Sequence, residues 1–427
     1  MENKRENIVK YSKTNLRQNK MIKRAEYINE LKKWQDEQVI KVITGIRRCG
    51  KSTLMSQFIE LLRDDGVSNK QIISINFEEL EFEELLDYKK LYEYIKSRLV
   101  SGKKSYIFLD EIQKVAQFEK VVDSLYVKPD IDIYITGSNA YMLSTELATL
   151  LTGRYVEIKM LPLSFGEFAS VSNLDAKQAF SNYLKNGGFP YITTMNDAID
   201  KIDTYLEGIY NTVIVKDIED RQTRKQKEPD RRKVTDIALL KNIAKYLSSV
   251  VGSPVSIKSI TDYLISSGRK VSPNTVSDYV EALCEAFIFY PVERFDIVGK
   301  QILKTNPKFY IVDLGLRNHI LPRRDYDFGF SIENIVYFEL LRRGHRVYIG
   351  KQGENEVDFV AQKDGIYTYI QVSADMTARQ TFEREICPLK AIKDNYKKLI
   401  LTADKNTLGN YDGIEVVNLL EWLLKTK

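Results

Sequence analysis

The sequence is poor in cysteine, in long apolar runs and in net charge, and each shortage excludes a class of protein. Its three cysteines among 427 residues are odd in number and widely scattered, which excludes a disulfide framework and a zinc site built from cysteines. No apolar tract reaches the roughly 18 residues that a membrane-spanning helix needs, and the polar start has no signal-peptide core. We therefore predict a cytoplasmic protein with no membrane partner.

The net charge of +5 is small for a chain of this length. It permits nucleic acid as a partner without indicating one. The hydrophobic fraction of 43% and the charged fraction of 29% are typical of a globular protein. At about 150 residues per domain, the length predicts roughly two to four domains.

The most informative segment is a glycine-bounded run between an apolar stretch, residues 39–43, and a helical stretch, residues 53–63. The run reads Gly45, Ile46, Arg47, Arg48, Cys49, Gly50, Lys51 and Ser52. A loop of this pattern between a strand and a helix aims backbone N–H groups at the phosphates of a nucleotide. We expect Lys51 to reach the β- and γ-phosphates, Ser52 to ligate Mg²⁺, and the helix N-terminus at Thr53 to add positive potential. Cys49 is interpreted as a small spacer, the alternative being a thiol whose oxidation blocks the loop.

Two carboxylates follow a second apolar run, residues 106–109, which is typical of a buried parallel strand whose tip faces a ligand. Asp110 is expected to hold the hydration shell of Mg²⁺. Glu111 is expected to orient and deprotonate the water that attacks the γ-phosphate. A further strand at residues 72–77 separates these carboxylates from the glycine loop, the arrangement of NTPases that carry an additional catalytic glutamate.

Short apolar runs alternate with helical stretches along the first part of the chain, which predicts a parallel sheet with helical crossovers. The α/β fold expected is that of a P-loop NTPase. The run 131–136 is followed by Ser138 and Asn139, and either side chain could hydrogen-bond the attacking water or the γ-phosphate; the alternative is a polar turn. Arg154 precedes the last strand, at residues 155–158. It is either a solvated residue or an arginine finger near the nucleotide that acts across a subunit boundary, which would imply a homo-oligomer.

These motifs together resemble those of the prokaryotic AAA+-type ATPase family (AAA_14) whose C-terminal half is a domain of unknown function, DUF4143. Besides the glycine loop, the resemblance rests on residues 108–111, 136–138, 151–154, 162–165 and 187–190, and it covers nearly the whole chain. It implies ATP as the nucleotide, five parallel strands and a following helical lid. In related signalling ATPases a Gly-x-Pro element of the lid touches the nucleotide, so the resemblance makes Pro190 a candidate nucleotide-state sensor. A plain helix-breaking turn is the alternative.

A basic linker and a set of short helices follow the lid. The linker, residues 221–233, holds seven lysines and arginines and is either solvated or lies along a phosphate backbone. Helices predicted at residues 236–249, 257–266 and 275–287, with a hairpin around Gly299, indicate a winged-helix arrangement. Its third helix presents acids and no Lys or Arg, which is unfavourable for a major groove. The module is therefore a non-specific DNA binder or a protein-packing module, with phosphate contacts offered by Lys258, Arg269, Lys270, Lys300 and Lys304.

The last hundred or so residues resemble the PD-(D/E)XK nuclease fold. In that fold an aspartate and a second acid hold Mg²⁺, and a lysine two residues after the second acid activates water. Asp358 fits the first role, but Gln371 and Ser373 stand at the acid and lysine positions, and a serine cannot supply the positive charge. One interpretation is a metal site built from Glu333, Asp358 and the Gln371 carbonyl. The favoured one is an inactive scaffold or DNA-holding domain.

We therefore predict five regions: an N-terminal arm and helix, a P-loop ATPase core, a helical lid with the basic linker, a winged-helix domain and a degenerate nuclease-like domain, at residues 1–38, 39–170, 171–233, 234–325 and 326–427. The predicted function is Mg²⁺-dependent ATP hydrolysis that drives a conformational change of the C-terminal region on or near DNA. The alternatives are an ATP-controlled DNA nuclease and a slow nucleotide-dependent switch that recruits a protein partner.

Overall fold

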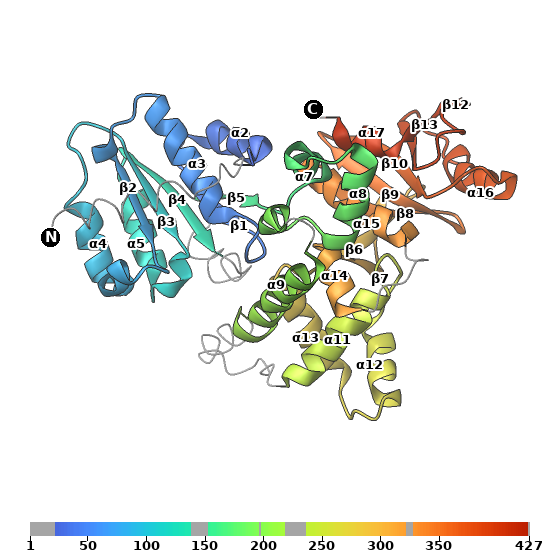
Figure 1. The fold of residues 1–427 in the computed structure, drawn as a ribbon, viewed down its shortest axis with the longest axis horizontal. Coiled ribbons are helices and arrows are strands. Elements are labelled where there is room, and N and C mark those ends of the chain that lie inside the picture. The colour runs from blue at the N-terminus through green and yellow to red at the C-terminus, as the bar shows by residue number, and fades with distance from the viewer. Residues whose placement is uncertain (1–21, 138–152, 196–197, 218–235, 322–327, 426–427) are drawn as a thin grey trace.

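Two sheets, joined by a layer of helices, organise the chain (Figure 1). The structure is a computed structural model and describes residues 22–137, 153–195, 198–217, 236–321 and 328–425. The first sheet has five parallel strands in the order β2-β3-β4-β1-β5. These strands are β1 (Ile40–Thr44), β2 (Ile72–Asn76), β3 (Ser105–Asp110), β4 (Ile131–Gly137) and β5 (Tyr155–Lys159). The predicted P-loop fold, a parallel sheet with helical crossovers, is confirmed.

The central strands of this sheet are buried because helices cover both of its faces. Every residue of β1, β3 and β4 is buried, as near-continuous apolar runs predict for a parallel sheet. On one face α3 (Lys51–Asp64) packs with α2 (Ala25–Trp34), whose Tyr27 and Leu31 are buried as expected. On the other face lie α4 (Tyr88–Lys96) and α5 (Phe118–Tyr126). Helix α3 begins directly after the glycine loop.

The helical lid consists of four short elements that lie between the two sheets in Figure 1. They are α8 (Ala176–Asn186), the 3₁₀-helix η5 (Pro190–Thr194), α9 (Ile199–Asn211) and the π-helix η6 (Thr212–Asp217). Before them, α7 (Phe165–Val171) starts in a capping box, in which the Ser164 hydroxyl accepts the N–H of Glu167 and the Glu167 carboxylate accepts the N–H of Ser164. Proline opens η5, where its missing N–H is not needed.

Three helices and a hairpin follow close to their predicted ranges. The elements are α11 (Ile237–Ser249), α12 (Ile257–Ser266), α13 (Pro273–Glu285), β6 (Phe289–Asp296) and β7 (Gln301–Ile311), followed by α14 (Leu314–Ile320). The hairpin does not stand alone, however, because β6 also pairs in parallel with β8 of the C-terminal region. The predicted winged-helix and nuclease-like regions therefore share one sheet.

That second sheet is mixed and has the order β12-β13-β11-β10-β9-β8-β6-β7. Its C-terminal elements are α15 (Phe328–Arg342), β8 (Arg346–Gln352), β9 (Asn355–Lys363), β10 (Ile366–Ser373), α16 (Arg379–Lys390), β11 (Lys397–Thr402), β12 (Gly409–Tyr411), β13 (Ile414–Asn418) and α17 (Leu419–Leu424). Strands β8, β9 and β10 run antiparallel in turn, and β11 is parallel to β10. Among the described helices, none is long and apolar enough to cross a membrane.

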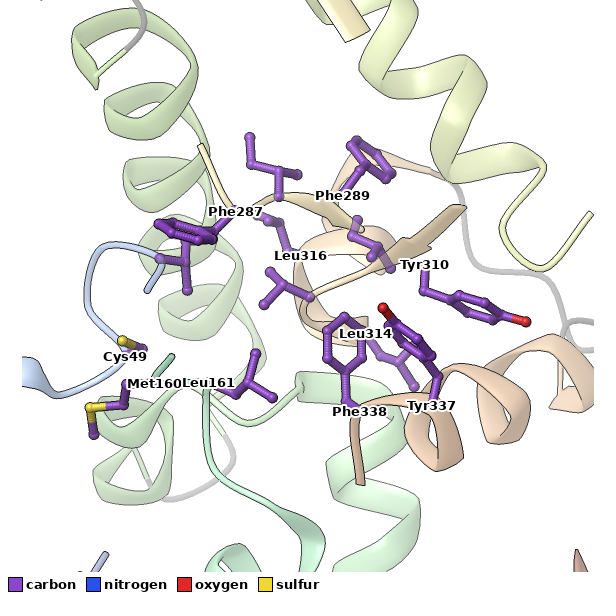
Figure 2. Close-up of a cluster of buried hydrophobic side chains, with 14 of the residues drawn as sticks. Cys49, Met160, Leu161, Phe287, Phe289, Tyr310, Leu314, Leu316, Tyr337 and Phe338 are labelled. Carbon is purple, nitrogen blue, oxygen red and sulfur yellow. The ribbon is translucent and has the colours of Figure 1, made fainter. Parts of the chain in front are cut away.

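One apolar core runs without a break from the glycine loop to the second sheet (Figure 2). It includes Cys49 and Met160 in the ATPase core, Leu316 of α14, and Tyr337 and Phe338 of α15. The glycine loop and the C-terminal region therefore share one packed core.

Candidate functional site

The glycine loop joins β1 to α3 and adopts the conformation that its glycines allow. Gly45 and Gly50 have φ angles of +144° and +106°. A Cβ atom on Gly45 would lie 2.0 Å from the carbonyl oxygen of Met160, so no other residue fits there. The buried Lys51 ammonium donates to the carbonyl oxygens of Gly45, at 3.0 Å, and Ile46, at 3.4 Å. The loop carbonyls thus hold the ammonium over the loop itself.

The two predicted metal-binding residues meet at the C-terminal edge of the sheet. Asp110, the last residue of β3, is hydrogen-bonded to the side chains of Ser52 and Thr136. Burial raises the pKa of Asp110, and these two hydrogen bonds oppose the rise. Thr136, at the end of β4, also accepts the backbone N–H of Glu111 at 3.0 Å. Thr136 was not predicted as a site residue, although it lies in the motif at residues 136–138.

Glu111 has a backbone conformation that is uncommon for a residue with a side chain. Its φ of +55° lies in the left-handed region, which costs roughly 1 kcal/mol or more and is retained mainly at functional sites. The residue is buried, and one carboxylate oxygen accepts a hydrogen bond from the Gln113 side chain. The strained turn places this carboxylate one residue beyond Asp110, which is predicted to bind the metal.

A cavity of about 830 Å³ opens between the glycine loop and the helical lid. Its lining residues come from the loop, from the ends of the strands and from the lid: Arg47, Arg48, Gly50, Lys51, Ser52, Thr53, Glu78, Glu111, Pro190, Tyr191, Thr194, Tyr205 and Thr212. The predicted sensor Pro190 lies against the loop, since its Cγ would be 3.7 Å from a Cβ on Gly50. The sensing role itself stays a prediction. Tyr191, Tyr205 and Thr212 also line the cavity. Nothing in the sequence connects these residues with the glycine loop, which is far away along the chain.

Charges of both signs face this cavity. The Arg47 guanidinium lies 3.1 Å from the Glu78 carboxylate, which follows β2. Although burial opposes it, the hydrogen bond and charge of Arg47 lower the pKa of Glu78. Loop cations and the carboxylate of Glu111 in the lining of one cavity suit a ligand that is anionic and that must also meet a base.

Two predicted features cannot be compared with the site, and a third lies elsewhere. Ser138, Asn139 and the basic linker lie outside the described residues. Arg154 lies at the opposite end of β1 from the loop, where its carbonyl accepts the N–H of Ile40. Its guanidinium pairs with Asp123 and lies 5.3 Å from the centre of the Tyr126 ring. Arg154 therefore lies away from the glycine loop of its own chain, and the role as a finger across a subunit boundary stays a prediction.

Arg24 is a site residue that the sequence did not reveal. Its side chain is buried and donates to the carbonyl oxygens of Cys49, at 3.1 Å, and Leu161, at 2.7 Å. It also forms an ion pair with Glu167 at 2.8 Å. A guanidinium suits this task because its donors form a planar, fixed fork. Arg24 therefore connects the backbone of the glycine loop, at Cys49, to the segment around Leu161 that leads into the lid.

The second predicted site, in the C-terminal sheet, is assembled differently from the expectation. The Gln371 side-chain oxygen accepts the backbone N–H of Asp358 at 3.0 Å, so it is turned into the sheet. The Ser373 hydroxyl donates to the carbonyl of Asp375. A cation does reach Glu333, but it is Lys308 from β7, which the sequence did not indicate. The Gln371 side chain, which one interpretation assigned to a metal site, is therefore hydrogen-bonded within the protein to Asp358 and Glu385.

Taken with the parallel sheet, the glycine loop and the acidic pair define the chain as a P-loop protein of the AAA class. Family models match three consecutive regions: an AAA domain at residues 37–169, a domain of unknown function (DUF8612) at 177–327, and the domain of unknown function DUF4143 at 328–422. An uncharacterized protein of Haemophilus influenzae is 39% identical over 411 residues, which are 95% of this chain and 99% of that protein. The chain belongs to this family of AAA-type ATPases with a C-terminal DUF4143 domain.

Other relatives are more distant. An uncharacterized protein of Methanocaldococcus jannaschii is 31% identical over 418 residues, covering 90% of this chain and 88% of that protein. Among solved structures, the Walker-type ATPase of Pyrococcus abyssi has a TM-score of 0.48 and 16% identity over 71% of this chain and 97% of that chain. The ORC1 protein of Aeropyrum pernix in complex with DNA has a TM-score of 0.26 and 13% identity, over 70% and 91%.

Replacing Arg24 by alanine should loosen the glycine loop. The change leaves buried carbonyl oxygens of Cys49 and Leu161 without a donor, so we expect a loss of about 1–3 kcal/mol in the free energy of unfolding. We also expect a higher KM for ATP with a smaller change in kcat. Thermal unfolding and steady-state phosphate release measure the two effects. Arg24→Lys should recover only part of the loss, and Lys23→Ala, at the exposed neighbouring position, should change neither.

Proposed function

We propose that the chain hydrolyses ATP with Mg²⁺ and transmits the nucleotide state through the lid to the C-terminal region. The observation that carries this proposal is the meeting of Lys51, Ser52, Asp110 and Glu111 at one edge of the first sheet, where Lys51, Ser52 and Glu111 line a cavity that residues of the lid also line. Membership of the AAA-type ATPase family supports it.

Each residue has a distinct part in this scheme. The loop N–H groups and Lys51 bind the phosphates. Ser52 and Asp110, already hydrogen-bonded to each other, would hold Mg²⁺, which neutralises charge on the phosphate oxygens. Glu111 orients the attacking water and accepts its proton. Ser138 or Asn139 reports on the γ-phosphate, and Arg154 of a neighbouring subunit adds a positive charge to the transition state.

Coupling to the C-terminal region is proposed to run through the residues before Pro190. The Gly188 N–H donates to the Asp313 carboxylate at 2.6 Å, and the same carboxylate accepts the Leu316 N–H at 3.0 Å and so caps α14. The fit is close, because a Cβ on Gly187 would lie 2.1 Å from Asp313 Oδ1. Any shift of Pro190 against the glycine loop therefore bears on the start of α14.

Burial makes the ionised form of the Asp313 carboxylate unfavourable. Burial raises its pKa to about 6, although the backbone N–H groups of Gly188, Leu316 and Gly315 oppose the rise. A raised pKa means that the folded state disfavours the ionised carboxylate that neutral pH requires. A contribution to stability therefore does not explain why Asp313 is present. Its connection of the lid to α14 does.

Action on or near DNA is part of the proposal, with the basic linker as its main support. Two of the cations that the sequence offered for phosphate contacts are paired within the chain: Lys300 with Asp394 at 2.7 Å and Arg269 with Asp236 at 2.7 Å. DNA contact through this module would have to replace these pairs. The ATPase rate with and without single-stranded, duplex and branched DNA measures whether DNA is a partner.

Two substitutions at the glycine loop and acidic pair should separate nucleotide binding from turnover. Lys51→Ala should abolish ATP binding in calorimetry, because it removes the charge on the phosphates. Glu111→Gln should keep ATP binding and lower kcat by about 100-fold or more, because the amide cannot accept the proton. Lys70→Ala and Glu83→Gln, both at exposed positions, are the matched controls. Equal phosphate release by Glu111→Gln and the parent would refute the assignment.

Asp313→Ala should uncouple the C-terminal region from the nucleotide. In a Glu111→Gln background, ATP should change the hydrogen exchange of α14 and of α11–α13, and Asp313→Ala should remove this change while ATP still binds. Asp313→Asn, which keeps an acceptor oxygen, should keep part of it, and Asp262→Ala at an exposed position should keep all of it. If Asp313→Ala leaves the nucleotide-dependent exchange intact, the coupling runs elsewhere.

A further inference from the structure

The second sheet contains a buried lysine that is surrounded by carboxylates. Lys308 lies on β7, and its side chain is only 4% exposed. Its Nζ is 2.7 Å from an oxygen of Glu356 on β9 and 3.4 Å from an oxygen of Glu333 on α15. Asp358, two residues beyond Glu356, is close enough to act on it electrostatically. We call Lys308, Glu333, Glu356 and Asp358 the Lys308 cluster.

One oxygen of Glu333 and one oxygen of Asp358 are already hydrogen-bonded within the protein. The Tyr310 hydroxyl donates to the same Glu333 oxygen that faces Lys308. One Asp358 oxygen accepts the Val372 N–H at 2.8 Å. In the part of the chain that the structure describes, no group of three or more His, Cys, Asp or Glu side chains is placed to hold a metal ion. The residues present therefore do not fit the Mg²⁺ that a nuclease-like fold implies.

The Lys308 cluster nevertheless needs a positive charge, because its carboxylates lie close together. Buried carboxylates that lie close together cannot all ionise unless a positive charge or protons compensate them. Burial and the neighbouring Glu333 raise the pKa of Asp358 well above its ordinary range. Burial lowers the pKa of Lys308, but Glu333, Glu356 and Asp358 outweigh this effect and raise it. The Lys308 ammonium, at 2.7 Å from Glu356 and 3.4 Å from Glu333, is the counter-ion of the cluster.

We propose that Lys308 is a built-in cation that occupies the position of the divalent metal in the C-terminal domain, so that the domain is metal-free and does not cleave DNA. The nuclease-like pattern has a lysine at position 373, where this chain has Ser373. Lys308 supplies a positive charge in its place but does not take over its role of activating water. Its ammonium lies among the carboxylates themselves, where it excludes a metal ion. This inference does not depend on ATP hydrolysis by the first sheet.

The test is to remove the ammonium and ask whether a metal site appears. Mn²⁺ binding to the full chain, without nucleotide, is measured by electron paramagnetic resonance. An Asp110→Ala background removes the carboxylate that is proposed to bind metal at the glycine loop. The parent should bind no Mn²⁺ at the Lys308 cluster. Lys308→Met should bind one equivalent at least tenfold more tightly than the parent, and Mn²⁺ should raise its unfolding temperature.

Controls assign the new site to the cluster. Adding Asp358→Asn or Glu333→Gln to Lys308→Met should abolish the gained equivalent. Lys300→Met, which removes a lysine from the same hairpin, should gain none. A folded Lys308→Met chain that gains no Mn²⁺ would overturn the proposal.

The parent chain gives an independent test that needs no Lys308 variant. Mn²⁺ binding by the parent that Asp358→Asn removes would overturn the proposal, as would Mn²⁺-dependent DNA nicking that Asp358→Asn abolishes. Either result would make Lys308 a neighbour of an active metal site. The absence of both supports a metal-free domain even if Lys308→Met is too unstable to measure.

Discussion

The structure depends on hydrogen bonds to four consecutive residues, Met160 to Leu163, where β5 leaves the first sheet. The Met160 N–H donates to Thr44 at the end of β1, and Arg24 binds the carbonyl of Leu161. Arg342 of α15 donates to the carbonyl of Pro162, and the Leu163 N–H donates to the carbonyl of Gly188. The ATPase core, the lid and the C-terminal region thus share one short backbone segment as a common support.

The glycine-loop site and the Lys308 cluster each hold a buried lysine near carboxylates, but the lysine has different partners in the two sites. At the glycine loop, Lys51 is held by backbone carbonyls, and Asp110 is held by hydroxyl groups, so both charges remain available to a ligand. In the second sheet, Lys308 is paired directly with Glu333 and Glu356, so its positive charge is neutralised within the protein. The first arrangement leaves charges that a ligand can meet, and the second does not.

The sequence identified the candidate site residues that belong to a local sequence pattern. The glycine loop, Asp110 and Glu111 were found because a strand, a turn and a helix in succession fix where their side chains point. Lys308 and Asp313 were missed because nothing near them in the chain signals a role. Arg24 acts on Leu161, a residue 137 positions away. Arg154 was correctly predicted to precede β5, but only the assembled sheet shows that this point lies at the opposite end of β1 from the glycine loop.

The sequence by itself determined the parallel sheet, the order of the helices and the identity of the phosphate-binding loop, since periodicity and glycine positions act over a few residues. Only the tertiary structure decided that the hairpin of β6 and β7 joins the C-terminal sheet, that Gly188 bonds to Asp313, and that Lys308 fills the acidic cluster. The reason is physical: these contacts join elements that are distant in sequence, and burial gives them their strength by removing water.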